Sequence, residues 1–250
     1  MLRILLLAVL LTLCASPTWA VSMFNVDHKG NSYDVVRLEK GEEQQLGFYW
    51  KRPDGSAYGT IQALREAVVK EGMELKIATN GGIYSKSFTP LGLYIENGKR
   101  YYRLNRGKGG GNFFLLPNGV FYITDEGAAV VDAAGYNPRQ KVRYAIQSGP
   151  MLVRNGRLHL RFIESSASLY VRNGVGVDRE GRVVFAISDL PVNFHDFATL
   201  FRDRLDAPNA LYLDGSISAM YAPELNRYGG WGIHTYTSII ALTADGEPAR

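Results

Sequence analysis

Apolar residues are concentrated in short runs along most of the chain, and each run ends close to Gly, Asn, Asp or Pro. Short runs rich in Val, Ile, Tyr and Phe predict β-strands, and turns such as Asn97-Gly98 predict tight hairpins between them. We expect strands at residues 33–38, 46–50, 75–79, 91–95, 101–104, 112–116, 120–124, 142–146, 151–153, 158–160, 169–172, 174–178, 183–187, 210–213 and 238–242.

Two segments, residues 60–71 and 192–205, have helical spacing instead. Their recurring apolar positions are Ile61, Leu64, Val68 and Val69 in the first, and Phe194, Phe197, Ala198, Phe201 and Leu205 in the second. Many hairpin-linked strands and few helices predict an α+β fold. We expect a large, twisted, mainly antiparallel or mixed sheet with two main helices packed on it.

The first twenty residues have the pattern of a secretory signal peptide. Arg3 precedes an apolar run at residues 4–13, and small residues precede a cut after Ala20. This apolar run is too short to span a membrane comfortably. We therefore expect residues 1–20 to be removed, leaving one domain at residues 21–250 in the periplasm or outside the cell, with no stable membrane insertion.

The only cysteine, Cys14, offers a different cut, that of a lipoprotein signal. Leu13 stands directly before it, where such signals need a small residue, so this alternative is disfavoured. A chain cut after Ala20 contains no cysteine, which excludes disulfides, thiol nucleophiles and thiolate metal sites.

Charge changes this picture little. The formal charge of +4 becomes +3 if Arg3 is removed, and both signs are interspersed along the chain. Basic clusters such as Arg139-Gln-Lys141-Val-Arg143 are short, so a solvated face is a better interpretation than a nucleic-acid patch. We expect no nucleic-acid partner, and a preference for anionic envelope polymers stays open.

Several common catalytic signatures are absent from the sequence. It has no Gly-x-Ser-x-Gly elbow, no complete P-loop and no His-Glu-x-x-His motif. The four histidines are scattered at positions 28, 159, 195 and 234, without the usual spacing of metal ligands. We therefore expect no metal and no cofactor.

Four strand-like runs end at Gly beside a small polar or charged residue, and we expect these ends to converge on one polar cleft. The four ends are Asn80-Gly81-Gly82, Ser148-Gly149-Pro150, Arg172-Asn173-Gly174 and Asp214-Gly215-Ser216.

Three of these residues are candidates for catalysis. Asp214 can serve as a nucleophile or activate water, and the alternative is an acid that caps its Gly-Ser turn. Arg172 can clamp an anion, and the alternative is a pair with a structural acid such as Asp178. Ser148 can present its hydroxyl where charge develops, or act as a nucleophile if His195 or His234 supplies a base.

Further residues are candidates for substrate binding. Asn80 offers amide hydrogen bonds, and the glycines after it allow close approach of the backbone, although a turn role is the alternative. Tyr84, Tyr221 and Trp231 are candidates for stacking on a sugar, although most aromatic residues belong to the core. The expected binding set is Asn80, Gly81, Gly82, Tyr84, Gly149, Asn173, His195, Gly215 and Ser216.

These segments resemble the phosphodiester glycosidase family, over roughly residues 33–242. The resemblance lies in Asn80-Gly-Gly-Ile-Tyr84, Gln147-Ser-Gly-Pro-Met-Leu-Val153, Arg172-Asn-Gly-Val-Gly176 and Leu213-Asp-Gly-Ser216. The family includes the animal enzyme that removes N-acetylglucosamine from its phosphodiester link to mannose. An exported bacterial branch of unknown function is most similar, since it shares Asn193-Phe-x-Asp-Phe, Asn209–Ser218 and Tyr221-Ala-Pro223. Ser216 stands where the animal enzyme has Gly, and His195 where related bacterial chains often have an aromatic residue.

The resemblance implies an exported hydrolase of a sugar 1-phosphodiester, with a small carbohydrate or polysaccharide as substrate. Two alternatives stay open: a non-catalytic module that binds glycans in the same cleft, and an acyl hydrolase built on Ser148 and a histidine. Glu164 and Asp178 are fallback candidates for a second catalytic acid.

Overall fold

The computed structural model describes residues 21–214, 217–229 and 235–246. The expected signal peptide at residues 1–20 lies outside the described residues. The same holds for four candidate residues, Gly215, Ser216, Trp231 and His234.

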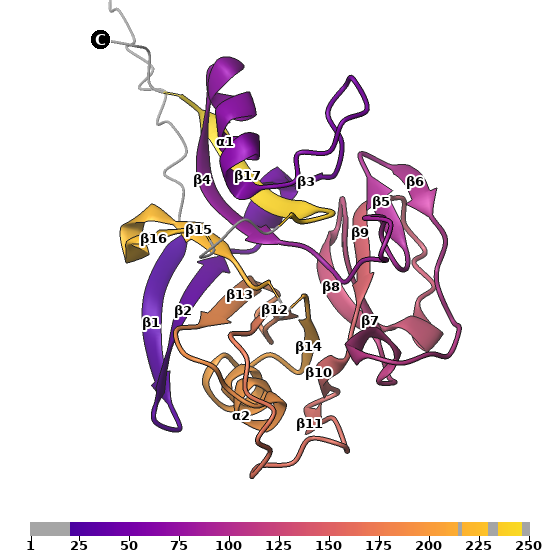
Figure 1. Ribbon diagram of the computed structural model, residues 1–250, viewed down its shortest axis with the longest axis vertical. Helices are drawn as coiled ribbons and strands as arrows, with labels where there is room; N and C mark the ends of the chain where they lie inside the picture. The colour runs from indigo at the N-terminus through magenta and orange to yellow at the C-terminus, as the bar shows by residue number, and fades with distance from the viewer. Residues whose placement is uncertain (1–20, 215–216, 230–234, 247–250) are drawn as a thin grey trace, which may run out of the picture.

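The described chain forms seventeen strands in three sheets, and every registered strand pair is antiparallel (Figure 1). The seven-stranded sheet has the order β1 (Ser22–His28), β2 (Asn31–Leu38), β13 (Val183–Ser188), β12 (Asn173–Val177), β14 (Asn209–Tyr212), β10 (Met151–Arg154) and β11 (Arg157–Leu158). The second sheet has the order β16 (Arg227–Tyr228), β15 (Met220–Ala222), β4 (Met73–Asn80), β17 (Ile239–Asp245) and β3 (Leu46–Tyr49). The third has the order β6 (Lys99–Tyr102), β5 (Tyr94–Glu96), β9 (Val142–Ser148), β7 (Gly119–Thr124) and β8 (Gly127–Asp132).

Two helices pack on these sheets. Helix α1 (Ile61–Lys70) begins at Thr60, whose hydroxyl accepts from the backbone N–H of Ala63 at 3.0 Å, and its apolar face covers β4. Helix α2 (Phe194–Thr199) begins at Asn193, whose side chain accepts from the N–H of Asp196 at 2.8 Å. A π-helical turn at Leu200–Arg204 extends it. The expected α+β class, antiparallel pairing and two main helices are thus confirmed.

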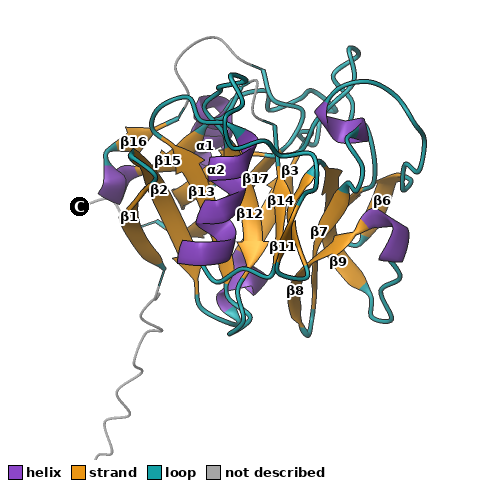
Figure 2. Ribbon diagram, turned by 90° about the horizontal axis from the view of Figure 1, so that it is seen from below, coloured by secondary structure: helices purple, strands orange, loops and turns teal. Residues whose placement is uncertain are grey.

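The strands divide among three sheets because they enclose a shared core. Val36 and Phe185 of the first sheet, Ile77 of the second, and Phe121 and Ile146 of the third belong to one buried hydrophobic cluster. A single open sheet of this many strands would be unusual, since sheets beyond about ten strands tend to curl or split. Figure 2 shows most of the long loops gathered at one end of the sheets.

Some local expectations were wrong. Residues 112–116 contain a 3-10 turn at Asn112–Phe114 in place of a strand, because a short apolar run alone does not distinguish a strand from a buried turn. At residues 169–172 only an isolated bridge between Tyr170 and Val192 forms. No helix among the described residues combines the length and apolar character that crossing a bilayer requires.

Candidate active site

Asn80, the last residue of β4, joins several strand ends through one side-chain amide. It is 1% exposed. Its Oδ1 accepts from Nδ2 of Asn173 at 2.9 Å and from the backbone N–H of Ala219 at 2.8 Å, while its Nδ2 donates to the carbonyl of Asp214 at 3.0 Å. A buried amide with partners on both atoms fixes the relative positions of these segments.

Asn173 opens β12 and extends this network. Its Nδ2 also lies 2.8 Å from Oγ1 of Thr79, and its Oδ1 accepts from the hydroxyl of Ser218 at 3.2 Å. The Ser218 hydroxyl also lies 3.4 Å from the carbonyl of Asp214. The carbonyl of Asp214 is therefore bonded by the side chains of Asn80 and Ser218, and Asn173 of the seven-stranded sheet bonds both of those side chains.

Ser148, the last residue of β9, is fully buried. Its hydroxyl donates to the carbonyl of Leu213 at 2.9 Å and accepts from the N–H of Ile83 at 3.3 Å. These bonds tie β9 to the residue before Asp214. The structure thus brings Asn80, Ser148, Asn173 and the Asp214 backbone together at one junction.

The glycines at this junction allow close packing of the chain on itself. A Cβ atom at Gly81 would lie 2.2 Å from Oγ of Ser238, and one at Gly82 would lie 2.9 Å from the carbonyl of Gln147. At Gly149 it would lie 2.7 Å from Cβ of Asn118. Any side chain at these three positions would push the strand ends apart.

Asp214 and Tyr84 lie near each other at this end of β4. Asp214 is half-buried. Burial raises the pKa of the Tyr84 phenol, and the negative charge of Asp214 raises it further. The phenol donates to the carbonyl of Thr235 at 3.1 Å, and the Tyr84 ring stacks on Phe88 with centroids 5.3 Å apart. A half-buried carboxylate and an aromatic side chain at the same strand end suit recognition of a sugar.

The side chain of Arg172, the residue directly before β12, contacts Val192, Tyr212 and Phe194, and all its described hydrogen bonds go to residues outside the junction. It is 1% exposed and lies under α2. Its Nε donates to the carbonyl of Val192 at 2.8 Å, Nη2 to the carbonyl of Ser168 at 3.0 Å, and Nη1 to the hydroxyl of Tyr212 at 3.2 Å. The guanidinium also lies 3.6 Å from the ring centre of Phe194.

The alternative pairing of Arg172 with Asp178 does not form, since Asp178 pairs with Arg182 at 2.8 Å. Burial lowers the pKa of Arg172, and the Tyr212 hydroxyl partly offsets this effect. The described contacts connect Arg172 to the site through Tyr212, which lies two residues before Asp214.

His195 lies in α2 within a cluster that has the composition of a metal site. Ligand atoms of Glu164, His195 and Asp196 all lie within 4.8 Å of one another. The ammonium group of Lys29 is 2.5 Å from Glu164 and 3.3 Å from Asp196, so a cation of the protein already occupies this cluster. We assign no metal there.

Comparison with known proteins identifies the family to which the chain belongs. The sequence profile of the phosphodiester glycosidase family matches residues 73–246. A relative from Escherichia coli K12, the uncharacterized protein YigE, is 38% identical over 208 residues, which cover 82% of this chain and 80% of the relative. The chain belongs to the phosphodiester glycosidase family.

Solved structures agree with this membership at the level of the fold. The catalytic domain of zebrafish N-acetylglucosamine-1-phosphodiester α-N-acetylglucosaminidase, auto-inhibited by its pro-peptide, superposes with a TM-score of 0.64 at 17% identity, covering 92% of this chain and 84% of that one. A hypothetical protein from Synechocystis gives a TM-score of 0.54 at 12% identity, covering 90% and 62%. A Burkholderia pseudomallei protein described as exported gives 0.57 at 11%, covering 85% and 74%.

Sequence reasoning missed several members of the junction. Thr79, Ala219 and the Leu213 carbonyl all contribute hydrogen bonds to it. Ser218 could have been identified as a member, because its hydroxyl lies only four residues after Asp214 in the sequence. Backbone donors and acceptors leave no trace in residue identity, so the sequence cannot identify them.

Proposed function

We propose that this phosphodiester glycosidase family member is an exported hydrolase of a sugar 1-phosphodiester in an envelope or extracellular polysaccharide. The observation that carries the proposal is the junction itself: Asn80 donates to the carbonyl of Asp214, and Asn173 in turn donates to Asn80. The Asp214 charge also raises the pKa of the Tyr84 phenol. The zebrafish relative is named for cleavage of an N-acetylglucosamine-1-phosphodiester, which supports this class of substrate.

In the proposed reaction the bond between the anomeric carbon and the phosphate oxygen breaks. The electron pair stays with the oxygen, so a phosphomonoester leaves, and the oxygen of water ends on the anomeric carbon. Because that leaving group is already a stable anion, the site needs less help from an acid than glycosidases with two carboxylates. Asp214 acts as the nucleophile or takes the proton of the attacking water.

In this proposal Arg172 is a positioning residue. Its donors engage Val192, Ser168 and Tyr212, so it fixes the strand that delivers Asp214. The Ser148 hydroxyl similarly anchors the Leu213 carbonyl, which disfavours a role as acyl-transfer nucleophile. The binding contacts proposed for the sugar come from Tyr84 and the segments around Gly81, Gly149 and Asn173.

Hydrolysis of a panel of sugar 1-phosphodiesters and nucleotide-sugars, followed by sugar release, tests the proposal. We expect turnover of at least one substrate, and we expect Asp214→Asn to lower kcat by about 10³-fold or more with folding intact. Asp206→Asn is a matched control, because Asp206 is an exposed acid paired with Arg179. Retention of glycans without any release would instead establish a non-catalytic binding module.

A further inference from the structure

An aromatic and cationic cleft lies outside the junction described above. It has a volume of about 640 Å³ and lies between the end of β3, the following loop at residues 51–58, and the β5–β6 hairpin. Its lining includes Trp50, Lys51, Arg52, Tyr58, Asn97 and Tyr101. The one acidic residue among the described residues that line it, Glu96, is partly buried and accepts a hydrogen bond from the hydroxyl of Tyr94 at 2.8 Å. A smaller hollow of about 280 Å³ lies on the same hairpin turn, since it shares Asn97, and it is lined also by Asp125, Lys141 and Arg143.

The aromatic residues of the cleft form a rigid platform. The Trp50 ring meets Tyr94, Tyr101 and Tyr102 edge-on, with centroid distances of 5.5 to 5.9 Å. Tyr101 is 43% exposed, whereas Trp50 is 6% exposed, so Tyr101 presents the accessible ring. A tyrosine held in this way offers a flat apolar surface and a hydroxyl at small entropic cost.

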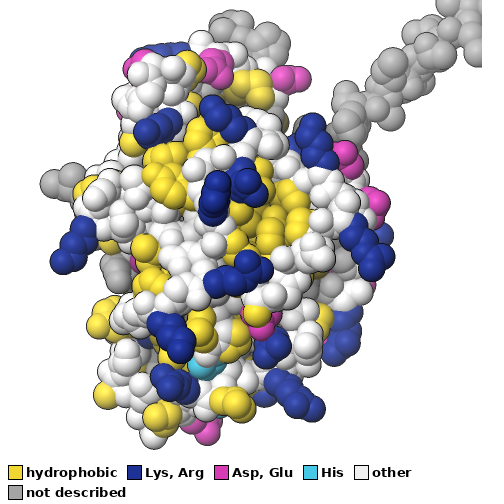
Figure 3. Space-filling model, turned by 90° about the vertical axis from the view of Figure 1, so that its right-hand side faces the viewer, with side chains coloured by type: hydrophobic (Ala, Val, Ile, Leu, Met, Phe, Trp, Pro, Cys, Tyr) yellow, Lys and Arg dark blue, Asp and Glu magenta, His cyan; other side chains and the backbone are white. Residues whose placement is uncertain are grey.

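Cations surround this platform. Lys51 lies 4.4 Å from the Trp50 ring centre, Arg52 lies 4.9 Å from that of Tyr58, and Lys99 lies 4.8 Å from that of Tyr101. Figure 3 shows hydrophobic side chains interrupted by Lys and Arg, with few acidic groups, on this side of the molecule.

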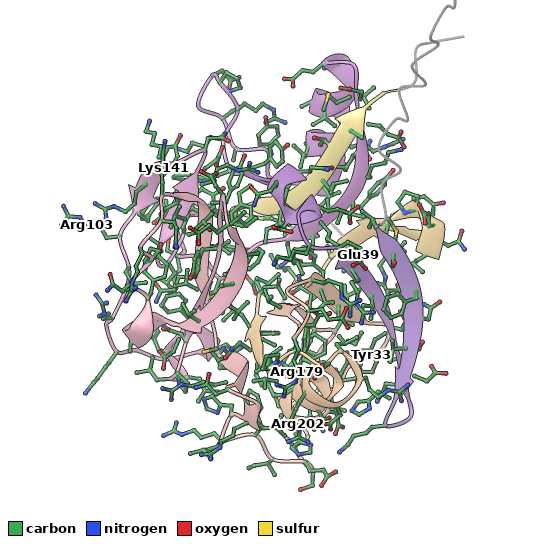
Figure 4. The ribbon with its side chains drawn as sticks, turned by 180° about the vertical axis from the view of Figure 1, so that it is seen from behind. Tyr33, Glu39, Arg103, Lys141, Arg179 and Arg202 are labelled. Carbon is green, nitrogen blue, oxygen red and sulfur yellow. The ribbon has the colours of Figure 1, made fainter. Side chains whose placement is uncertain are left out.

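The charge of the chain is distributed unequally. Residues 99–143 contain eight Lys and Arg but three Asp and Glu, a net charge of +5, whereas the whole chain has +4. Within the described parts of the chain, none of these eight cations forms an ion pair. In Figure 4, Lys141 and Arg103 extend from this side, whereas Arg179 and Arg202 lie in another part of the molecule. A local excess of unpaired cations attracts anions.

The cleft also adjoins the proposed active site. Ile239 of β17 pairs with Tyr49 on one side and with Asn80 on the other. Since neighbouring strands are about 4.8 Å apart, the edge of the cleft begins about 10 Å from Asn80. A chain molecule of a few sugar units can span that distance.

We propose that this cleft binds an anionic glycan chain, with a sugar ring on Tyr101 and its carboxylate or phosphate groups near Lys51, Arg52 and Lys141. Nucleic acid fits less well, because non-specific binding of single strands uses several open aromatic faces in succession. Here Tyr101 is the one exposed residue among the described aromatic residues that line the cleft, so no succession of open faces is present. The inference goes beyond the proposed hydrolysis and does not require turnover.

Binding is tested with the Asp214→Asn chain, so that no cleavage interferes. The probes are oligogalacturonate, which carries carboxylates, a glycosylated poly(glycerol phosphate), which carries phosphodiesters, neutral dextran and single-stranded DNA. We expect binding of at least one anionic glycan, weaker binding at high salt, and no binding of dextran. The two anionic probes distinguish carboxylate from phosphate recognition.

Variants locate the binding. We expect Lys51→Gln with Arg52→Gln, and separately Tyr101→Ala, to weaken glycan binding by about five- to tenfold. Arg179→Gln with Arg202→Gln removes the same charge elsewhere on the surface and should leave affinity within about twofold. Because Arg52 also donates to the carbonyl of Ala57, Lys51→Gln with Lys141→Gln provides a second test that spares this loop contact.

Three results would overturn the inference: no binding of either anionic glycan, equal losses in the cleft and control variants, or tighter binding of DNA than of glycans. Cleavage of a small sugar 1-phosphodiester by the cleft variants, with Asp214 intact, separates the two proposals. Turnover should persist there while polymer binding falls, and a chain without any turnover can still bind the polymer.

Discussion

The polar side chains of the strand-end junction and those of the cationic cleft differ in whether they have partners within the protein. At the junction and beneath it, Asn80, Asn173, Ser148 and Arg172 direct their donors and acceptors at other parts of the same chain. In and around the cleft, Lys51, Lys99 and Lys141 are exposed, and no described carboxylate forms an ion pair with them. Polar groups with internal partners build the architecture, whereas cations without acidic partners are available to a ligand.

Among the polar groups with internal partners, Arg172 is expected to give the largest loss of stability when it is changed to Ala. It removes a buried guanidinium from Val192, Ser168 and Tyr212 and leaves a cavity against Phe194. We expect the free energy of unfolding to fall by about 3 kcal/mol or more in urea titrations. If Arg172 instead clamps substrate directly, Arg172→Lys would keep the stability and lose turnover.

Asn173→Ala is expected to have the next largest effect. The change leaves Oδ1 of Asn80 and the hydroxyls of Thr79 and Ser218 without one partner each. Loss of about 2 kcal/mol of unfolding free energy should accompany a loss of turnover, since the Asp214 backbone depends on this network. An unchanged denaturation midpoint would show that the network contributes little to stability.

His159 links stability to pH. It is buried, its Nε2 lies 3.0 Å from the carbonyl of Leu116, and its Nδ1 accepts from the N–H of Arg161 at 3.2 Å, a pattern that requires the neutral ring. Burial lowers its pKa in the folded state, so the unfolded chain binds the proton first as pH falls through about 6.5. The melting temperature should therefore fall below that pH.

His159→Gln is the matched control, because its amide can still donate to Leu116 but does not titrate. The variant should show a shallower decline of melting temperature between pH 7.5 and pH 5.5. His28, whose pKa burial also lowers, contributes in the same direction, so some decline should remain. Identical pH profiles for the two chains would contradict the assignment.

Lys51→Gln with Arg52→Gln should have the smallest effect on stability. Both side chains belong to an exposed loop, so we expect the unfolding free energy to change by about 0.5 kcal/mol or less. The measurement is again urea denaturation, beside the binding assay. A large loss of stability would show that these cations stabilise the fold, as the junction residues do, and would contradict the difference drawn between the cleft and the junction.

The sequence predicted much of the fold and of the junction. Apolar runs ending at glycine located the ends of β4, β9 and β14, because a strand that leaves the core must turn there. The run at residues 169–172 forms no strand, and Asn173 instead begins β12. The sequence could not determine the direction of Arg172, since its side depends on the pairing of β12 with β13 and β14. It also missed β1, an edge strand in which most residues are partly exposed. It interpreted short clusters such as Arg139–Arg143 as a solvated face and left a preference for anionic polymers open.

The position of β17 has a consequence for how the molecule assembles. This strand, the last in the described chain, lies between β3 and β4, which have no direct pairing in their sheet. The Asn80 end of β4 and the aromatic edge beyond β3 are therefore unconnected until residues 239–245 insert between them. A chain shortened before Ile239 would lose the strand that joins β3 to β4, and with it the buried core residues Ile240 and Leu242.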